Sequence, residues 1–421
     1  MTPRRPRLIA IAAATAAAML AGCGTIGGAA TPRASRPIVF GISLSLTGGF
    51  SADGQAFQRG YRLWQSDVND HGGILGRQVK LIILNDNSDP KKVAANYRTL
   101  ITVDHVAMTL GPFSSLLTAP ADQAVAKYGY AMIEGAGAAV SVFASPTNKK
   151  YHNIFCPSLP VAAYMKPFVQ WIKSLPAPER PKTAAYPTVD DPFATPAVVT
   201  AQKDLEALGI KTSYSTINKP FAEKPSAYKT PAEAVAQSGA QMVVLGSTDV
   251  PTVSEFMKVF EENHYNPKIF IAVSGPDQGL SFEGTVGKAN ADGMMVPDGW
   301  YGAYSNALSS AMVEEYIARY GGLASGINAD VAEAFSVGEV AADAITATGG
   351  TDNAKIMKYL HGPVTLQTVQ GAVHFTKLGE NASPLVAAFI SQWQSGSYVQ
   401  VLPAKEAGST SIEFPKHVWG S

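Results

Sequence analysis

The chain has 421 residues, of which 46% are hydrophobic and 16% are charged, and its formal net charge is zero. A balanced charge without a block of basic residues offers no electrostatic footprint for nucleic acid or for an anionic membrane surface, so we expect neither as a direct partner. About 380 residues follow the N-terminal segment, more than one hydrophobic core usually supports, which predicts two domains.

Residues 1–23 have the pattern of a bacterial lipoprotein export signal. Three arginines among the first seven residues precede an apolar run, Leu8 to Ala21, that is too short to span a bilayer stably. The run ends in Leu20-Ala21-Gly22-Cys23, which matches the lipobox, where the cysteine thiol receives a diacylglyceryl group. We therefore expect an exported protein anchored to the outer face of the cell membrane by lipid on Cys23. The alternative is that Cys23 is an ordinary residue beside a conventional cleavage site.

The segment after the signal, residues 24–37, is small, polar and proline-bearing, which is typical of a flexible tether. The only other cysteine is Cys156, so with lipid on Cys23 no disulfide can form within the chain. No later apolar stretch has the length needed to cross a membrane. This excludes a receptor with its own transmembrane helix.

From Ile38 onward, short β-type runs alternate with amphipathic helical patterns, which is typical of parallel sheets covered by helices on both faces. The first helical stripe holds Phe57, Tyr61, Trp64 and Val68, whose spacing places them on one face. A second helix is predicted to begin at Pro90. The strands predicted in this half are Ile38 to Leu44, Val79 to Leu84, Val106 to Leu110 and Tyr130 to Ile133.

A second α/β series begins near Tyr164. Its helices have equally clear inner faces, and a later helix carries an apolar stripe between Val331 and Ile345. Two β-like segments, Ala372 to Phe375 and Leu385 to Gln392, follow toward the end of the chain. The other strands predicted in this series are Lys182 to Tyr186, Lys211 to Ile217, Met242 to Leu245 and Ile269 to Ala272.

Ligands of open parallel sheets bind outside the carboxyl ends of the strands, so the loops that follow the strands should carry the site. These loops are rich in Gly, Ser, Thr and Asp, and their free N–H groups and hydroxyls suit a carboxylate or another polar acceptor. They are Ser45 to Gly54, Gly111 to Ser115, Glu134 to Val140, Thr188 to Thr195, Gly246 to Asp249 and Val273 to Gln278.

Several blocks in these loops together point to a known family. They are Leu44 to Phe50 (LSLTGGF), His71 to Arg77 (HGGILGR), Asn85 to Pro90 (NDNSDP), Gly111 to Ser115 (GPFSS) and Asp190 to Phe193 (DDPF). In this order and spacing they strongly resemble the leucine/isoleucine/valine-binding family, the type I periplasmic solute-binding proteins of ABC transporters. The resemblance spans nearly the whole chain after the signal.

The resemblance implies two doubly wound parallel-sheet lobes that are joined by three crossings and close like a hinge around a small molecule. By this similarity, 38–156 and 298–372 form lobe 1, 157–297 and 373–404 form lobe 2, and 405–421 is a C-terminal tail. It also implies a monomer that delivers its ligand to ABC permease subunits, without a cofactor or metal. An amino acid, an amide, a urea-like compound or a short carboxylate would be the ligand.

The resemblance also carries over candidate ligand contacts. Ser115 matches the serine that holds the ligand carboxylate in amino-acid-binding relatives, whereas the neighbouring Ser114 either contacts ligand or caps the following helix. Ala136 and Ala138 lie where relatives present backbone groups and a threonine hydroxyl. Because Ala138 replaces that threonine, one polar contact to an amino acid is missing.

In the second lobe, Phe193 matches an aromatic residue that covers the ligand, and Asp277 lies near the acidic residue that meets a ligand ammonium group. For both, ordinary loop packing is the competing interpretation. The remaining candidates for lining the cleft are Phe50, Ser247, Thr248 and Trp300.

The sequence gives weaker signals for two other classes of function. Gly135-Ala136-Gly137 follows a predicted strand as in a dinucleotide site, but the third glycine and the later acidic residue are missing. The seven histidines show no metal-type pairing, and no Gly-x-Ser-x-Gly motif occurs, so we expect no enzyme. A ligand-sensing lipoprotein that signals to a membrane partner stays open, because the same fold serves both roles.

Overall fold

A computed structural model describes residues 36–138, 152–303, 306–383, 388–404 and 409–419. The predicted export signal, the lipobox with Cys23 and nearly all of the tether lie outside the described residues. None of the described helices is both long enough and apolar enough to cross a membrane. Residues 36–421 form one compact unit that contains two lobes.

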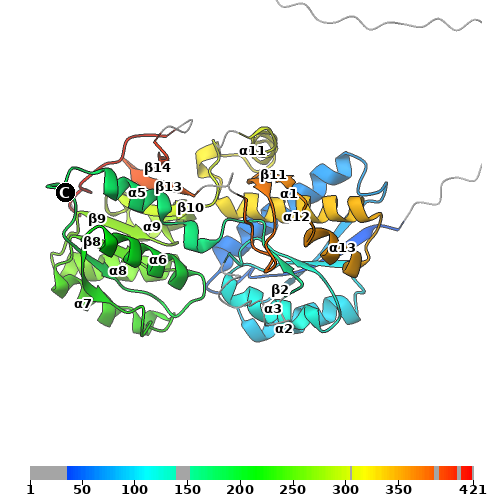
Figure 1. The fold of residues 1–421 in the computed structure, drawn as a ribbon, viewed down its shortest axis with the longest axis horizontal. Coiled ribbons are helices and arrows are strands. Elements are labelled where there is room, and N and C mark those ends of the chain that lie inside the picture. The colour runs from blue at the N-terminus through cyan, green and yellow to red at the C-terminus, as the bar shows by residue number, and fades with distance from the viewer. Residues whose placement is uncertain (1–35, 139–151, 304–305, 384–387, 405–408, 420–421) are drawn as a thin grey trace, which may run out of the picture. The chain divides into compact units, whose positions relative to one another are not determined.

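The first lobe is built on a sheet of five parallel strands in the order β2-β1-β3-β4-β5. Helices α1 and α12 cover one face of this sheet, and α2 and α3 cover the other (Figure 1). The strands are β1 (Ile38–Leu44), β2 (Val79–Asn85), β3 (Met108–Leu110), β4 (Met132–Ile133) and β5 (Ile154–Phe155). The helices of this lobe are α1 (Ser51–Asp70), α2 (Pro90–Thr102), α3 (Ser115–Ala126), α11 (Ala307–Tyr320), α12 (Ala329–Thr348) and α13 (Asn353–Leu360), with η5 (Ala324–Gly326) and the small hairpin β11 (Leu366–Thr368) and β12 (Gly371–Val373).

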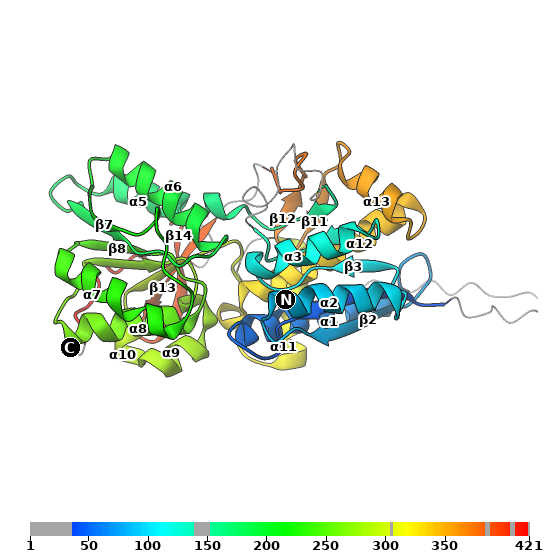
Figure 2. The ribbon, with the colours of Figure 1, turned by 90° about the horizontal axis from the view of Figure 1, so that it is seen from below.

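The second lobe contains a seven-stranded sheet in the order β14-β13-β10-β9-β8-β6-β7. Five neighbouring strands, β10, β9, β8, β6 and β7, are parallel, while β13 and β14 run antiparallel at one edge. In Figure 2, α5 and α6 lie on one side of this sheet and α7 to α10 on the other. The strands are β6 (Thr183–Tyr186), β7 (Lys211–Ser215), β8 (Met242–Leu245), β9 (Ile269–Ala272), β10 (Met294–Asp298), β13 (Phe389–Gln394) and β14 (Ser397–Leu402).

The helices of the second lobe are shorter than α1 and α12 of the first lobe. They are α5 (Lys166–Ser174), α6 (Ala194–Ala207), α7 (Lys229–Ser238), α8 (Val250–Glu262), α9 (Leu280–Val286) and α10 (Lys288–Ala291), with the 3-10 turns η2 (Val161–Ala163), η3 (Pro225–Ala227) and η4 (Pro276–Gln278). Three of the helices begin with a proline in the first two positions, where the missing N–H group costs no hydrogen bond. Asp89 and Asp249 cap α2 and α8 by accepting from backbone N–H groups.

The structure confirms the predicted two-lobed parallel-sheet fold. The stripe Phe57, Tyr61 and Trp64 is buried in the first core, on the side where α1 packs against α12. A glycine in each helix permits the close approach: a methyl group added at Gly338 would lie 2.1 Å from the Trp64 ring, and one at Gly60 would lie 2.3 Å from a backbone oxygen of α12. The two helices run in parallel, so both N-termini point to the same end of the lobe.

The last crossing between the lobes falls later than the predicted boundary at residue 373. Residues 373–383 lie on the first lobe, where Phe375 is part of the first core and the Cys156 N–H donates to the Gly379 carbonyl at 2.8 Å. A methyl group at Gly379 would lie 1.9 Å from the Ile154 carbonyl oxygen, so this chain segment passes directly along β5. The predicted segment Ala372 to Phe375 is therefore part of the first lobe.

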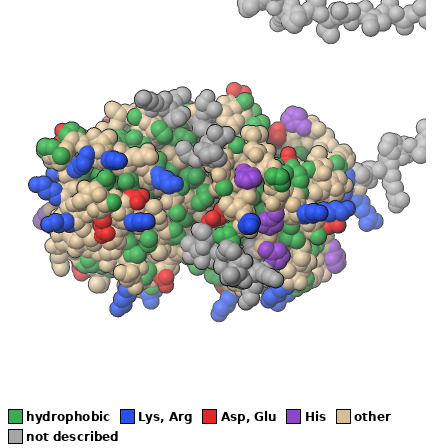
Figure 3. Space-filling view, viewed as in Figure 1, with side chains coloured by type: hydrophobic (Ala, Val, Ile, Leu, Met, Phe, Trp, Pro, Cys, Tyr) green, Lys and Arg blue, Asp and Glu red, His purple; other side chains and the backbone are tan. Residues whose placement is uncertain are grey.

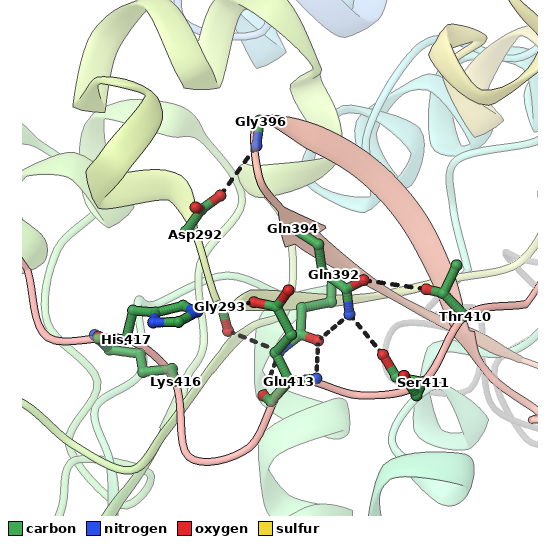
Figure 4. Close-up of polar contacts among 10 residues, drawn as sticks. All are labelled: Asp292, Gly293, Gln392, Gln394, Gly396, Thr410, Ser411, Glu413, Lys416 and His417. Atoms are coloured by element: carbon green, nitrogen blue, oxygen red, sulfur yellow. Dashed lines mark hydrogen bonds and ion pairs between the residues drawn. The ribbon is translucent and has the colours of Figure 1, made fainter.

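The segment predicted as a C-terminal tail lies along the second lobe over residues 409–419 (Figure 4). The buried Gln392 amide accepts from the Glu413 N–H at 2.9 Å and donates to the Glu413 carbonyl at 3.0 Å and the Gly293 carbonyl at 3.3 Å. Gln394 donates to the Ser411 carbonyl at 2.7 Å. These hydrogen bonds attach the segment to the second lobe, so the segment is part of that lobe.

Candidate functional site

A cavity lies between the two lobes and encloses about 610 Å³ of space that is free of atoms, part of it open to solvent. Its walls come from both lobes. The lining residues from the first lobe are Phe50, Asp53, Phe113, Ser114, Ala136, Ala329, Asp330 and Glu333. Those from the second lobe and from the crossings are Ala138, Tyr164, Asp191, Phe193, Thr248, Val273, Ser274, Asp277, Pro297, Asp298 and Gly299.

The strand order explains why these residues meet. In each lobe the parallel strands end at the same edge, so the loops that follow them gather there. β1, β3 and β4 deliver the first-lobe loops, and β6, β8, β9 and β10 deliver those of the second lobe. The N-terminus of α12 adds Asp330 and Glu333, one helical turn apart.

Seven of the ten ligand-binding residues predicted from the sequence line this cavity. They are Phe50, Ser114, Ala136, Ala138, Phe193, Thr248 and Asp277. Ser114 also caps α3, where its Oγ accepts from the Leu117 N–H at 3.4 Å. Ser114 therefore lines the cavity and caps α3, the two roles that the sequence suggested for it.

The other three predicted residues make contacts within the protein and are not part of the lining. The fully buried Ser115 hydroxyl donates to the Ala136 carbonyl at 3.3 Å. Ser247 donates to the Ser274 carbonyl at 2.5 Å, and the Trp300 Nε1–H donates to Ser309 Oγ at 2.9 Å. These three side chains therefore support the walls of the cavity in this structure.

Sequence reasoning missed five of the six acidic residues that line the cavity. The six are Asp53, Asp330 and Glu333 from the first lobe and Asp191, Asp277 and Asp298 from the second, and only Asp277 was predicted. Asp298 ends β10, a strand that the sequence pattern did not reveal. Asp53 and Asp330 lie in the first turns of α1 and α12, where acidic residues are usually read as helix-stabilising.

The acidic residues determine the charge of the cavity lining. Five of them are at most 8% exposed, and no lysine, arginine or histidine is among the described residues that line the space. Burial, with a further contribution from Asp277, raises the pKa of Asp53 to about 8. Burial and neighbouring carboxylates also raise the pKa of Asp298, Asp330 and Glu333 well above the usual range. On the face shown in Figure 3, the basic side chains lie over the outer surface of both lobes.

Further acidic residues surround Asp191. Burial raises the pKa of Asp191 to about 6, and the carboxylates that add to this effect are Asp190 and Asp249. Burial and the nearby Asp191 raise the pKa of Glu223 to about 8. Asp249 also raises the pKa of Asp53, so the acidic groups around Asp191 and those around Asp53 belong to one continuous acidic lining.

Several neutral polar groups of the cavity are already bonded to acids. Thr248 donates to Glu223, and the Ser274 hydroxyl lies 3.3 Å from Asp277 Oδ1. Gln278 of the second lobe donates to Asp53 of the first, which joins the two lobes at the cavity. Few side-chain donors are therefore left for an anionic group of a ligand.

Aromatic rings form the apolar part of the lining. Phe50 and Phe113 of the first lobe pack edge to face with ring centroids 5.7 Å apart. Tyr164 and Phe193 of the second lobe pack in the same way at 5.8 Å. Each lobe thus presents one aromatic pair, whose ring faces can cover hydrocarbon or a cation.

Glu134 lies beneath the loop that carries Ala136 and Ala138. Its side chain is fully buried, one carboxylate oxygen accepts from the Gly137 N–H, and the carboxyl group also shares a side-chain hydrogen bond with the Cys156 thiol. Burial raises the pKa of Glu134 to about 7. A methyl group added at Gly111 or Gly137 would lie within 2.4 Å of this side chain, so both glycines make room for it.

Two parallel-sheet lobes with a cavity between the carboxyl ends of their strands define a two-lobed binding protein. A family model described as "Periplasmic binding protein" matches residues 37–397, and the chain belongs to this family. Proteins of this family act outside the cytoplasm and bind small molecules. The predicted resemblance is thereby confirmed.

Individual relatives are more distant. A Leu/Ile/Val-binding protein homolog from Brucella abortus is 34% identical over 92 residues, which is 22% of this chain and 24% of that protein. The alignment thus spans about a quarter of the curated relative. A branched-chain amino acid substrate-binding protein from Streptococcus pneumoniae, solved with isoleucine, has a TM-score of 0.71 at 16% identity and covers 90% of this chain and 100% of that chain.

A solute-binding protein from Rhodopseudomonas palustris, solved with benzoate, has a TM-score of 0.68 at 15% identity, covering 91% of this chain and 98% of that chain. These two structures share the fold with this chain, yet their ligands differ from each other. The fold therefore leaves the choice of ligand to the residues of the cavity.

Proposed function

We propose that the protein is the solute-binding component of an ABC importer and that it captures a small polar metabolite in the cavity between its lobes. The observation that carries this proposal is the cavity itself, because it is lined from both lobes within a chain that belongs to the periplasmic binding proteins. Its contents would be shielded when the lobes close and released when they separate. The proposal includes no catalytic step.

The contact from Gln278 to Asp53 supports a closing motion of this kind, because it joins loops of opposite lobes at the cavity. A ligand held by both lobes stabilises the closed arrangement by its contacts to the second lobe, while a ligand held by one lobe does not. Ligand capture and lobe closure are therefore coupled in this proposal.

The test is a thermal-shift screen of amino acids, amides, amines and small carboxylates, followed by solution scattering with each compound that binds. We expect at least one compound to raise Tm and to reduce the radius of gyration. If no compound of these classes binds, the proposal loses its basis. If a ligand binds without any change in scattering, the capture role stands and the hinge motion does not.

We further propose that lipid on Cys23 holds the protein at the outer face of the membrane, next to the permease. The Leu20-Ala21-Gly22-Cys23 sequence at the end of the apolar run supports this anchoring. Cys23→Ala should appear in the soluble extracellular fraction, whereas Cys156→Ala, as a control, should stay with the membranes. A Cys23→Ala protein that is exported normally and still sediments with membranes would contradict the anchor.

A further inference from the structure

The cavity has a distribution of charge that the proposed function alone does not require. Six carboxyl groups line it, three from each lobe, and none of its described lining residues is basic. An amino acid carries one positive and one negative group, so a site for it needs an acceptor and a donor in balance. This cavity has a large excess of acceptors.

The two helix N-termini at the cavity do not balance these acids. Helices α1 and α12 both direct their N-termini there, and each terminus is equivalent to roughly half a positive charge. Together they offset about one of the three carboxylates that the first lobe contributes. Six ionised carboxylates in one cavity would repel one another strongly, so such groups either retain protons or ionise when a cation binds among them.

Two of these carboxyl groups have an oxygen without an N–H or hydroxyl partner. Oδ2 of Asp330 and Oδ2 of Asp191 are buried and accept no hydrogen bond from an N–H or hydroxyl group in the described part of the chain, although the Asp330 carboxyl shares a side-chain hydrogen bond with Asp53. Both residues are more than nine-tenths buried, and both line the cavity. Buried carboxylate oxygens are almost always paired, so these two mark positions where a ligand donor belongs.

The two oxygens come from opposite lobes of the cavity. Asp330 lies at the start of α12 with Asp53 and Glu333, while Asp191 follows β6 and lies close to Glu223 and Asp249. Aromatic rings from both lobes complete the lining between these loops. A matching ligand carries two cationic groups joined by hydrocarbon.

An organic cation fits these positions better than a metal ion. Within the described ranges, no three acidic, histidine or cysteine side chains converge closely enough to hold one ion. Metal sites require several oxygen ligands at short distance around a single point. The acids come from both lobes, three from each, which favours ligand charges that are themselves separated.

We propose that the cavity selects a small organic dication of the aliphatic diamine or polyamine class, with one ammonium group bound at Asp330 and the other at Asp191. This inference rests on the proposed solute-binding function and specifies its ligand. It departs from the anionic or carbonyl group that the sequence suggested for Ser115. It also predicts that the lobes close because the dication bridges them.

Binding of a dication should release protons. The acidic groups that face Asp330 and Glu333 keep protons in the ligand-free protein, because burial and mutual repulsion raise their pKa. A bound ammonium group favours the ionised carboxylates, so affinity should increase as pH rises through the pKa of Asp191, about 6, and that of Asp53, about 8. The titratable groups that act on these two residues are Asp53, Glu134, Asp277 and Asp298, all of them acidic.

The experiment is calorimetric titration of the purified protein with 1,4-diaminobutane, spermidine, butylamine, leucine, acetate and calcium chloride. Butylamine is the matched control, because it has the same hydrocarbon chain with one charge fewer. We expect a diamine or polyamine to bind at least tenfold more tightly than butylamine, and to release protons when measured in buffers of different ionisation enthalpy.

Asp330→Asn and Asp191→Asn should each weaken diamine binding at least tenfold, while Asp104→Asn, at an exposed position of the first lobe, should leave it unchanged. Asparagine keeps the shape of the side chain and is neutral at every pH, so both variants should melt no lower than the ligand-free wild type. If either variant fails to fold, the comparison of diaminobutane with butylamine decides the question.

Tighter binding of leucine, acetate or calcium than of any diamine would overturn the dication and leave the proposed function intact. Affinities within twofold of the wild type for both variants would also overturn it. If none of the six probes binds, this inference fails, and the proposed function is then judged by its own broader screen.

Discussion

The buried Glu134 offers the sharpest test of the electrostatics, through the substitution Glu134→Gln. Burial raises the pKa of this carboxyl from 4.5 in the unfolded chain to about 7 in the folded protein. The folded state therefore retains the proton longer than the unfolded state does, and folding is penalised as pH rises through this window. Glutamine fills the same space, and its carbonyl oxygen can still accept from the Gly137 N–H.

The size of the effect follows from the two pKa values. A difference between 4.5 and about 7 corresponds to roughly 3 kcal/mol at pH values above the folded pKa, and to almost nothing below pH 4.5. Because the amide does not titrate, Glu134→Gln should gain stability over the wild type as pH rises from about 4.5 to 7, and should keep that gain at higher pH.

The assay is urea unfolding of the ligand-free wild type and variant at pH 4.5, 6 and 8. Glu262→Gln, at an exposed position at the end of α8, is the matched control and should follow the wild type at every pH. A Glu134→Gln protein that is less stable than the wild type at pH 8, or whose stability difference does not change with pH, would refute the buried-charge argument.

Two further predictions concern packing and the C-terminal segment. Gly338→Ala should lower the free energy of unfolding by about 1 to 3 kcal/mol, because the added methyl group would overlap the Trp64 ring. The control Gly284→Ala, at a helical position with open space around it, should raise the free energy of unfolding by about 0.5 kcal/mol. A Gly338→Ala protein with the same urea midpoint as the wild type would contradict the close helix packing. Gln392→Ala should lower the free energy of unfolding by about 1 to 3 kcal/mol, because it leaves the Glu413 N–H without its partner. It should also make the C-terminal segment sensitive to carboxypeptidase. A C-terminus as resistant as that of the wild type would show that other contacts are enough to hold the segment on the lobe.

Local patterns were enough to predict most elements of the fold. Strands Ile38–Leu44, Met242–Leu245 and Ile269–Ala272 have the predicted bounds, and α1 buries the predicted stripe. β10 was missed for a physical reason: Met294–Asp298 is buried on both faces and contains Pro297, so it shows neither alternation nor the usual strand composition.

The predicted site residues show which details of the site a sequence pattern cannot predict. The Gly111 to Ser115 block predicts that both Ser114 and Ser115 lie at the start of a helix, but only the backbone conformation decides which of the two lines the cavity. Ser114 has a positive φ of 79° and lines the space, while Ser115 begins α3 and turns its hydroxyl to Ala136.

The sequence by itself determined the alternation of strands and helices, the family and the set of loops that surround a ligand, because hydrophobic periodicity and turn residues act over short distances. Only the tertiary structure decided the charge of the cavity. Asp53, Asp191, Asp277, Asp298 and Asp330 are far apart along the chain, and each is an ordinary loop or helix-start residue in its local context. They meet because parallel strands in two lobes end at one cleft, and burial there raises the pKa of these five carboxyl groups and of Glu333.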